Sequence, residues 1–197
     1  AASDVYKRQP IVAVTGTNGK STTVEITSHI LQKSGFSAPA VGNVGIPLIS
    51  FVDKQESVDV FVVEISSYQL ESTVDFKPEI AALLNISEDH LERHGDFKNY
   101  MESKFRIFRN QTKEDWAIIF RDDESLWRST EKIRAKKLGF GTGKRKEEGA
   151  WLVDHKIEVL LPDGREGTAD LRNFPVPGRH NALNAAVLAV EILALKY

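Results

Sequence analysis

The chain has 197 residues, of which 41% are hydrophobic and 27% are charged, and its formal net charge is −2. This balance is typical of a folded globular protein of one or two domains, and it excludes a largely disordered chain. Because lysine and arginine are not in excess, the composition favours neither nucleic-acid binding nor attachment to an anionic membrane.

Two further absences narrow the class of protein. The chain has no cysteine, which excludes a disulfide framework, a cysteine nucleophile and a thiolate metal site, and which fits a reducing compartment. It also has neither an apolar run of the ~18 to 20 residues that cross a bilayer nor the apolar core of a secretory signal. We therefore expect a cytoplasmic protein.

From residue 10 onwards, apolar β-branched runs alternate with patterns of helical period. Residues 1–9 match neither pattern, and we treat them as a tail or a cloning scar. In chain order, we expect a strand over 11–15, a helix over 21–34, strands over 58–65 and 80–86, a helix over 96–109 capped by Asp96, a strand over 116–120, a helix over 122–133, a β-hairpin within 151–171 and a helix over 181–197. This alternation predicts an α/β fold with a mostly parallel sheet flanked by helices, and a small β-hairpin annex.

The sequence GTNGKS over 16–21 lies between the first predicted strand and the first predicted helix. At such a junction, backbone N–H groups and the helix dipole can hold a phosphate. Lys20 would reach the β- and γ-phosphates, and the Ser21 hydroxyl would bind Mg²⁺. The order of strand, loop and helix favours this interpretation over an incidental glycine-rich turn.

Two more groups lie at the same predicted edge of the sheet. Glu64 ends a buried strand, where an acid needs a nearby cation, so we interpret it as a metal ligand rather than a surface acid. The cluster over 87–94 contains His90 and His94, but its spacing does not match a zinc protease. For His94 we favour a structural role in a polar loop. For Asn43, in GNVG, spacing alone does not separate a turn residue from a ligand.

These residues predict a phosphate-loop domain that uses ATP or GTP with Mg²⁺. The loop alone does not identify the acceptor of the phosphoryl group. A kinase or GTPase is disfavoured because the sequence has no base-reading motif for guanine.

Six motifs then occur in one order: TGTNGKST, GNVGIP, EISSYQLE, NISEDHLERH, SKFRIF and GRHNALN. Together they resemble the Mur ligases of peptidoglycan synthesis, and the resemblance extends from residue 11 to the end of the chain. The segment SSYQLE favours the members that add D-glutamate to UDP-N-acetylmuramoyl-L-alanine. Folylpolyglutamate synthases have a similar phosphate loop and are the alternative.

The resemblance implies a P-loop NTPase-like fold and an ATP-dependent acid–amino-acid ligase of the bacterial cytoplasm. ATP would convert the substrate carboxylate to an acyl phosphate, from which the amine of D-glutamate displaces phosphate. Two Mg²⁺ ions and Lys20 suit this chemistry, which depends on positioning and charge neutralisation. The implied partners are the two substrates, with neither nucleic acid nor membrane.

The resemblance also implies roles for individual residues. The implied catalytic residues are Lys20, Glu64, His90 and Lys104. The implied metal ligands are Ser21, Glu64, His90 and Lys104, the last as a carbamate whose oxygens resemble a carboxylate. ATP would be bound by Gly16, Thr17, Asn18, Gly19, Lys20, Ser21, Thr22, Asn181 and Asn184, and the muramoyl substrate by Asn43, Ser66 and Gln69. Read alone, Lys104 is a surface lysine, and Asn181 and Asn184 are a helix cap and a surface amide.

In this family the ATPase domain is the middle of three, and residues 10–197 correspond to that domain alone. The last predicted helix has no cap, which is typical of a chain cut within a helix. We therefore expect a single domain without the N- and C-terminal domains of the family, inactive by itself. A nucleotide-binding module without catalysis is the hypothesis from a different class.

Overall fold

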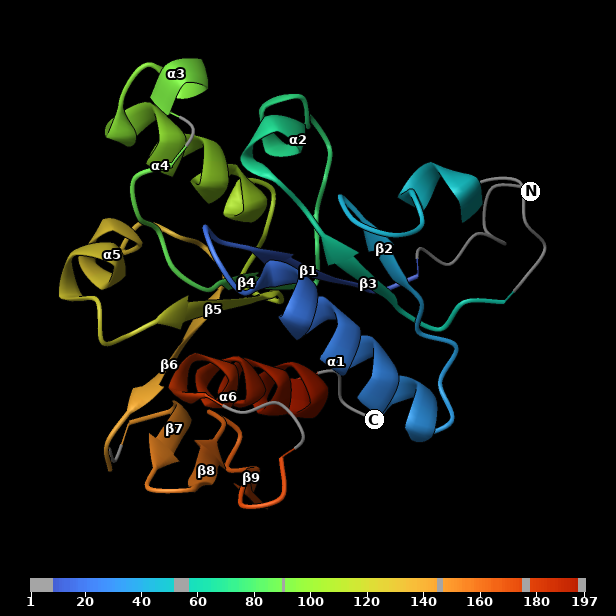
Figure 1. Cartoon of the computed structure of the whole chain (residues 1–197), viewed down its shortest axis with the longest axis vertical. Helices are drawn as coiled ribbons and strands as arrows, with labels where there is room; N and C mark the ends of the chain where they lie inside the picture. Colours follow the sequence, from blue (N-terminus) through green and yellow to red (C-terminus); the bar gives the residue numbers. More distant parts are fainter. Residues whose placement is uncertain (1–8, 52–56, 90, 145–146, 175–177, 195–197) are drawn as a thin grey trace.

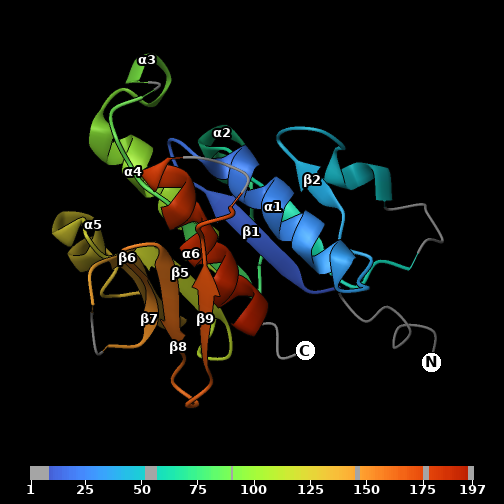
Figure 2. The same ribbon diagram turned by 60° about the horizontal axis from the view of Figure 1, so that its bottom comes forward.

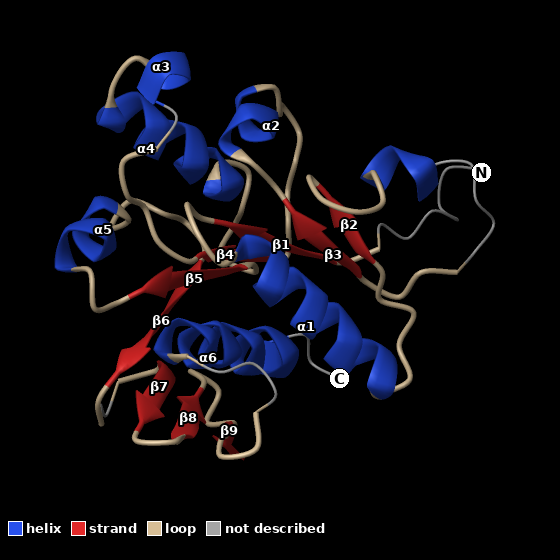
Figure 3. Ribbon diagram, viewed as in Figure 1, coloured by secondary structure: helices blue, strands red, loops and turns tan. Residues whose placement is uncertain are grey.

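The computed structural model describes residues 9–51, 57–89, 91–144, 147–174 and 178–194. In these residues the strands form one sheet in the order β2-β3-β1-β4-β5-β6-β7-β8-β9, with helices on both faces (Figures 1 and 3). The strands are β1 (Ile11–Thr15), β2 (Ala40–Gly42), β3 (Phe61–Glu64), β4 (Ile80–Leu83), β5 (Trp116–Phe120), β6 (Lys136–Thr142), β7 (Gly149–Val153), β8 (Lys156–Leu160) and β9 (Glu166–Asp170). The helices are α1 (Lys20–Lys33), α2 (Ser67–Glu71), α3 (Leu91–His94), α4 (Phe97–Phe105), α5 (Glu124–Ser129) and α6 (Arg179–Ala194), with 3-10 turns at Leu48–Phe51 and Arg106–Phe108.

Neighbouring strands from β2 to β7 are parallel, and β8 and β9 extend the sheet in antiparallel pairing. The register places Val14 of β1 beside Glu64 of β3, and Thr15 beside Leu83 of β4. Three central strands therefore end at the same level. This alignment brings the segments that follow β1, β3 and β4 together at one edge, where ligands of parallel sheets bind.

Alternate residues of each central strand enter two separate cores. Val12, Val62 and Ile118 pack on the side of α1 and α6. Ala13 and Val63 face the other side, together with Leu70 of α2, Ile107 of the 3-10 turn and Leu126 of α5. Burial on both faces explains why the central strands read as continuous apolar runs. The mostly parallel sheet flanked by helices, predicted from those runs, is confirmed.

Several predicted elements are confirmed, two of them with unchanged bounds. The predicted strands over 11–15 and 116–120 correspond to β1 and β5. The helix predicted over 96–109 is α4 followed by a 3-10 turn, with the Asp96 side chain accepting from the Asn99 N–H at 2.8 Å. The helix predicted over 122–133 is shorter. Asp123 is its N-cap and accepts from the Leu126 N–H, whereas the Asp122 side chain accepts from the Thr142 N–H outside the helix. β2, β6 and α2 were not predicted, because each is short or interrupted by glycine.

The annex contains the predicted hairpin and one more strand. β8 and β9 form the hairpin around Gly164, while β7 joins it to β6. Seen after the rotation in Figure 2, α6 lies between α1 and the annex, and Leu152, Ile157 and Val159 belong to the core on that side. No helix in the described part of the chain is both long and apolar enough to cross a bilayer.

Replacing Asp96 by alanine removes the side-chain cap of α4, which carries Tyr100 and Lys104. We expect Asp96→Ala to lower the free energy of unfolding by about 1 kcal/mol in urea titration. Lys98→Ala is the matched control, because the Lys98 side chain is 78% exposed on the same helix, and a change within about 0.5 kcal/mol is expected there. Equal effects of the two substitutions would contradict the capping role.

Candidate functional site

The predicted phosphate loop lies between β1 and α1, as the sequence indicates. Gly19 is the N-cap of α1 and adopts φ 87°, a left-handed conformation that favours glycine. The Gly19 carbonyl accepts from the backbone N–H and the side-chain hydroxyl of Thr23, which fixes the first turn of the helix. Ser21 and Thr22 are both partly buried in this turn. The arrangement points helix N–H groups toward the loop, where they can hold an anion.

Asn85, which follows β4, is hydrogen-bonded to the phosphate loop. Its Oδ1 accepts from the Asn18 N–H at 2.9 Å, its Nδ2 donates to the Asn18 carbonyl at 3.0 Å, and its own carbonyl accepts from the Thr17 N–H at 3.0 Å. A Cβ on Gly16 would lie 3.1 Å from the Leu84 Cβ, so the loop packs directly on this segment. Sequence reasoning missed Asn85, although an amide directly after a strand at this edge is a usable signal.

Two lysine ammonium groups converge on one carbonyl oxygen. Lys20 Nζ donates to the Gly16 carbonyl at 3.0 Å and to the Thr17 carbonyl at 3.0 Å. Lys104 Nζ, from α4, donates to the same Gly16 carbonyl at 2.9 Å. The two positive charges therefore lie next to each other at the phosphate loop. An anion bound between them would relieve their repulsion.

Lys104 is buried rather than on the surface, with 2% of the residue exposed. Burial and then the nearby charge of Lys20 lower the pKa of Lys104 to about 7, against an opposing effect of Asp89. The Nζ also lies 4.8 Å from the centre of the Tyr100 ring. A lysine with this pKa is partly a neutral amine at pH 7, which is the nucleophilic form.

Tyr100 connects Lys104 to the phosphate loop. Sequence analysis missed this, since a tyrosine at helical spacing reads as a core residue. The Tyr100 hydroxyl lies 3.1 Å from Thr17 Oγ1, which in turn accepts from the Ser87 N–H at 3.0 Å. Burial raises the pKa of Tyr100, so the phenol keeps its proton.

Glu64 is buried at the end of β3, with 2% of the residue exposed. Asn43 Nδ2 donates to Glu64 Oε1 at 3.1 Å, and the Asn43 N–H donates to the Glu64 carbonyl at 2.9 Å. Gly42 makes this approach possible, because a Cβ there would lie 2.1 Å from the Glu64 carbonyl oxygen. Glu64 Oε2 is buried without a hydrogen-bond partner among the described residues. An unpaired buried carboxylate oxygen is costly, and a bound cation would satisfy it.

Ser66 and Gln69 form the N-terminal cap of α2. Ser66 Oγ accepts from the Gln69 N–H, and Gln69 Oε1 accepts from the Ser66 N–H at 3.0 Å. This reciprocal pair is a capping box, which the S-x-x-Q spacing could have indicated. Gln69 is exposed and Ser66 is partly buried. Their predicted substrate contacts stay a prediction.

A cavity of about 130 Å³ lies where these groups meet. It opens between the phosphate loop, the segment after β2, the start of α2 and helix α4. The residues that line it are Lys20, Asn43, Ser66, Ser67, Tyr68, Asp89, Tyr100 and Lys104. The structure therefore brings the predicted phosphate-loop lysine, two predicted substrate residues and Lys104 to one small polar space.

The remaining predicted residues lie at different places. Asn184 of α6 lies against the loop, since a Cβ on Gly19 would be 3.0 Å from Asn184 Nδ2. Asn181 and Asn184 are both buried, not on the helix surface. His90 lies outside the described residues. Among those that are described, no group of three or more His, Asp or Glu side chains is placed to hold a metal ion.

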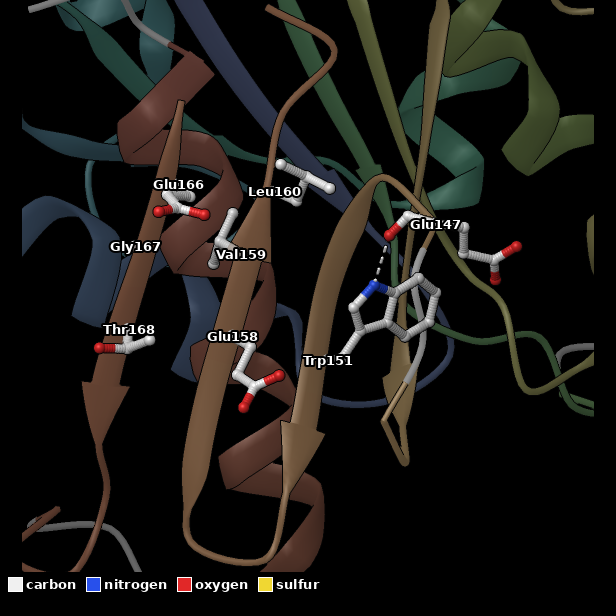
Figure 4. Close-up of a pocket in the computed structure, with 8 residues that line it drawn as sticks. All are labelled: Glu147, Trp151, Glu158, Val159, Leu160, Glu166, Gly167 and Thr168. Atoms are coloured by element: carbon white, nitrogen blue, oxygen red, sulfur yellow. Dashed lines mark hydrogen bonds between the residues drawn. The ribbon is translucent and has the colours of Figure 1, made fainter. Parts of the chain in front are cut away.

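A second, larger cavity of about 440 Å³ lies on the annex (Figure 4). The Trp151 indole donates to the Glu147 carbonyl at 2.9 Å, and Trp151, Glu158 and Thr168 follow one another across β7, β8 and β9. None of the predicted site residues lines this cavity. Of these two cavities, only the smaller one has cationic side chains and loop N–H groups together.

Comparison with known proteins matches a sequence model described as the Mur ligase middle domain to residues 14–191. The chain belongs to this family. The match includes the phosphate loop, Glu64, Lys104 and both asparagines of α6.

Individual Mur ligases are similar over nearly the whole chain. The UDP-N-acetylmuramoylalanine--D-glutamate ligase of Desulfosudis oleivorans is 41% identical over 190 residues, which are 96% of this chain and 41% of that protein. A solved UDP-N-acetylmuramoyl-L-alanyl-D-glutamate--2,6-diaminopimelate ligase has a TM-score of 0.71 at 23% identity, over 97% of this chain and 45% of that one. The MurF ligase from Thermotoga maritima in complex with ADP has a TM-score of 0.68 at 23% identity, over 95% and 46%. This Mur ligase chain thus spans less than half the length of each of these three relatives.

The lowered pKa of Lys104 has a consequence for stability. Unfolded lysine has a pKa near 10.5, so between pH 7 and pH 10.5 the unfolded chain binds more protons than the folded one, and the free energy of unfolding rises with pH. Relative to Lys104→Met, the wild type should gain up to about 1.4 kcal/mol per pH unit in this window. Urea titrations in CO₂-free buffers at pH 7, 8, 9 and 10 measure this gain. Lys98→Met, at an exposed position, should show no such trend, and a pH-independent difference for Lys104→Met would contradict the lowered pKa.

Proposed function

We propose that this chain is the ATPase domain of a longer bacterial cytoplasmic ligase that adds D-glutamate to UDP-N-acetylmuramoyl-L-alanine. The observation that carries the proposal is the 41% identity to a ligase of that name over 96% of the chain. The site geometry supports it, because Lys20 and Lys104 meet at a phosphate loop beside Glu64 and Asn43. The same features favour a ligase that uses ATP over a binding module without catalysis.

The phosphate loop would bind the triphosphate of ATP. Loop N–H groups and Lys20 would surround the β- and γ-phosphates, which requires Lys20 Nζ to leave the Gly16 and Thr17 carbonyls. The buried amides of Asn181 and Asn184 would contact the adenine end. Asn184 already lies against Gly19, so nucleotide binding and the position of α6 would depend on each other.

The described residues fit a divalent cation at Glu64. Its Oε2 is buried without a partner, and the Ser21 hydroxyl belongs to the first turn of the helix that begins at the loop. Oxygen donors of this kind suit Mg²⁺. When bound, Mg²⁺ would neutralise charge on the phosphates during transfer to the substrate carboxylate. His90 would be a ligand of a second ion.

Lys104 would act as a carbamate. A neutral amine can add CO₂, and the pKa of about 7 makes that form available at physiological pH. The product is an anion that no longer repels Lys20 and that presents oxygens to a metal ion. Asn43, Ser66 and Gln69 would hold the muramoyl substrate with its carboxylate in the cavity, where phosphorylation gives the acyl phosphate that D-glutamate attacks.

The activity assay is phosphate release by the full-length protein with ATP, Mg²⁺, UDP-N-acetylmuramoyl-L-alanine and D-glutamate. Release that requires all components is the expected result. Lys20→Ala should lower the rate at least about a hundredfold, because it removes a cation that stabilises the transferred phosphoryl group. Lys33→Ala, at the exposed end of α1, is the control and should keep the wild-type rate.

Two results would contradict the proposal. Release with a folate and L-glutamate instead would favour the folylpolyglutamate synthase alternative. Nucleotide binding without release under any of these conditions would favour the module without catalysis.

A second prediction concerns Lys104 as a carbamate. Lys104→Ala should lose activity, and added bicarbonate should not restore it, because the alanine side chain has no amine to add CO₂. A short carboxylic acid should restore part of the activity by supplying the missing carboxylate. Rates close to wild type in Lys104→Ala without any addition would contradict the carbamate.

A further inference from the structure

Buried Ser67 and His94 and exposed Glu71 form a hydrogen-bonded chain beside the cavity. His94 Nε2 lies 3.1 Å from Ser67 Oγ, and His94 Nδ1 lies 2.9 Å from Glu71 Oε1. Arg93 holds the other carboxylate oxygen of Glu71 at 3.3 Å. The sequence analysis gave His94 only a role in a polar loop, and neither Ser67 nor Glu71 has a role in the proposed function.

The ring of His94 is held in one orientation. It stacks on Tyr68 with a centroid distance of 5.5 Å and an interplanar angle of 5°, and it lies 5.2 Å from the Tyr100 ring. Only 1% of its side chain is exposed. The imidazole therefore cannot turn to exchange its two nitrogens without breaking both ring contacts.

This orientation fixes the direction of the hydrogen bonds. An ionised carboxylate only accepts, so His94 Nδ1 donates to Glu71. With the ring hydrogen on Nδ1, Nε2 is an acceptor, and the Ser67 hydroxyl donates its single hydrogen to it. Ser67 Oγ keeps its lone pairs and has no hydrogen left to donate. At the wall of the cavity, Ser67 is thus a neutral hydrogen-bond acceptor.

Most of the polar side chains around this acceptor are donors. Lys20 and Asn43 can donate to the carboxylate of a substrate in the cavity, whereas Ser67 cannot. In UDP-N-acetylmuramoyl-L-alanine, the donor next to the reacting carboxylate is the amide N–H of the alanyl unit. A cavity of about 130 Å³ can hold such a small terminal unit, with the carboxylate and the amide close together.

We propose that Ser67 is a specificity-determining residue whose Oγ accepts from the amide N–H beside the reacting carboxylate, and that His94 is the positioning residue that keeps Ser67 an acceptor. The inference rests on the proposed function and extends it to a substrate class: acids whose carboxylate follows an amide N–H. An ester oxygen in place of that N–H would face the lone pairs of Ser67. A site built around a hydrogen bond discriminates against an analogue that lacks the donor.

A hydrogen-bonded chain of serine, histidine and an acidic residue also occurs in hydrolases, where the serine is a nucleophile. Ser67 is 2% exposed at the start of a five-residue helix. The proposed ligase reaction needs no serine nucleophile, because phosphate is the leaving group and the amine attacks directly. The acceptor role is therefore the one that the chemistry of the site uses.

The test compares UDP-N-acetylmuramoyl-L-alanine with its depsi analogue, in which an ester oxygen replaces the amide N–H, as acceptors for the full-length protein. Wild type should prefer the amide by about two- to tenfold in kcat/KM, the worth of one hydrogen bond. Ser67→Ala should treat the two acceptors nearly alike. His94→Phe keeps the ring stacking but frees the Ser67 hydroxyl to rotate, so its preference should also fall. Ser125→Ala, at an exposed serine of α5, should keep the wild-type preference.

A purely structural role would change the melting temperature or the rates with both acceptors equally, and would leave the ratio unchanged. An unchanged ratio in Ser67→Ala, or no preference in wild type, would overturn the inference while the ligase activity stands. Labelling of Ser67 by a fluorophosphonate would also overturn it, in favour of a nucleophile. No phosphate release with either acceptor would contradict the proposed function and this inference together.

Discussion

The carbonyl oxygen of Gly16 accepts hydrogen bonds from two lysines, and the rest of the site depends on this interaction. It requires that β1 end beside β3 and β4, because the loop after β1 then contacts Asn85, which follows β4, and Lys104 of α4. It places two positive charges next to each other, at 3.0 Å and 2.9 Å from one oxygen, in a largely buried space. Such a pair is stabilised by an anion between the charges or by the loss of one proton. The fold provides for both, through the loop N–H groups and through the lowered pKa of Lys104.

The negative charge of Glu64 is also buried at this edge of the sheet, without a direct ionic partner among the described residues. Glu64 is buried at the end of β3 with one oxygen bonded to Asn43 and the other without a partner in the described residues. The cationic lysines and the anionic carboxylate therefore remain separate, instead of neutralising each other in a direct ion pair. In the proposed function, a phosphate group would lie beside the lysines and a metal ion beside Glu64, which is the arrangement that phosphoryl transfer needs.

Local patterns were enough to predict the parallel sheet, the phosphate loop and the Asp96 cap, since each depends on neighbours in the sequence. The burial of Lys104 was not predictable from its own segment, because it arises from contact with Gly16, 88 residues away. Tyr100 and Ser67 were missed for the same reason, since their partners are Thr17 and His94. Asn85 was missed although its place directly after a strand is a local signal. β6 was missed because Gly139 and Gly141, which allow Trp151 and Asp122 to pack closely, make the strand read as a loop. The family resemblance pointed to Lys104, and the end of a buried strand pointed to Glu64; both side chains are buried at this edge of the sheet, and their roles stay predictions.

The lowered pKa of Lys104 makes its side chain partly a neutral amine at pH 7, and we propose that this amine becomes an anionic carbamate at the phosphate loop. The most direct measurement is a ¹³C NMR spectrum of the protein in labelled bicarbonate, with Mg²⁺ and ADP. We expect one carbamate signal in the wild type that Lys104→Met lacks and Lys98→Met retains. No carbamate signal in the wild type, or the same signal in Lys104→Met, would contradict it.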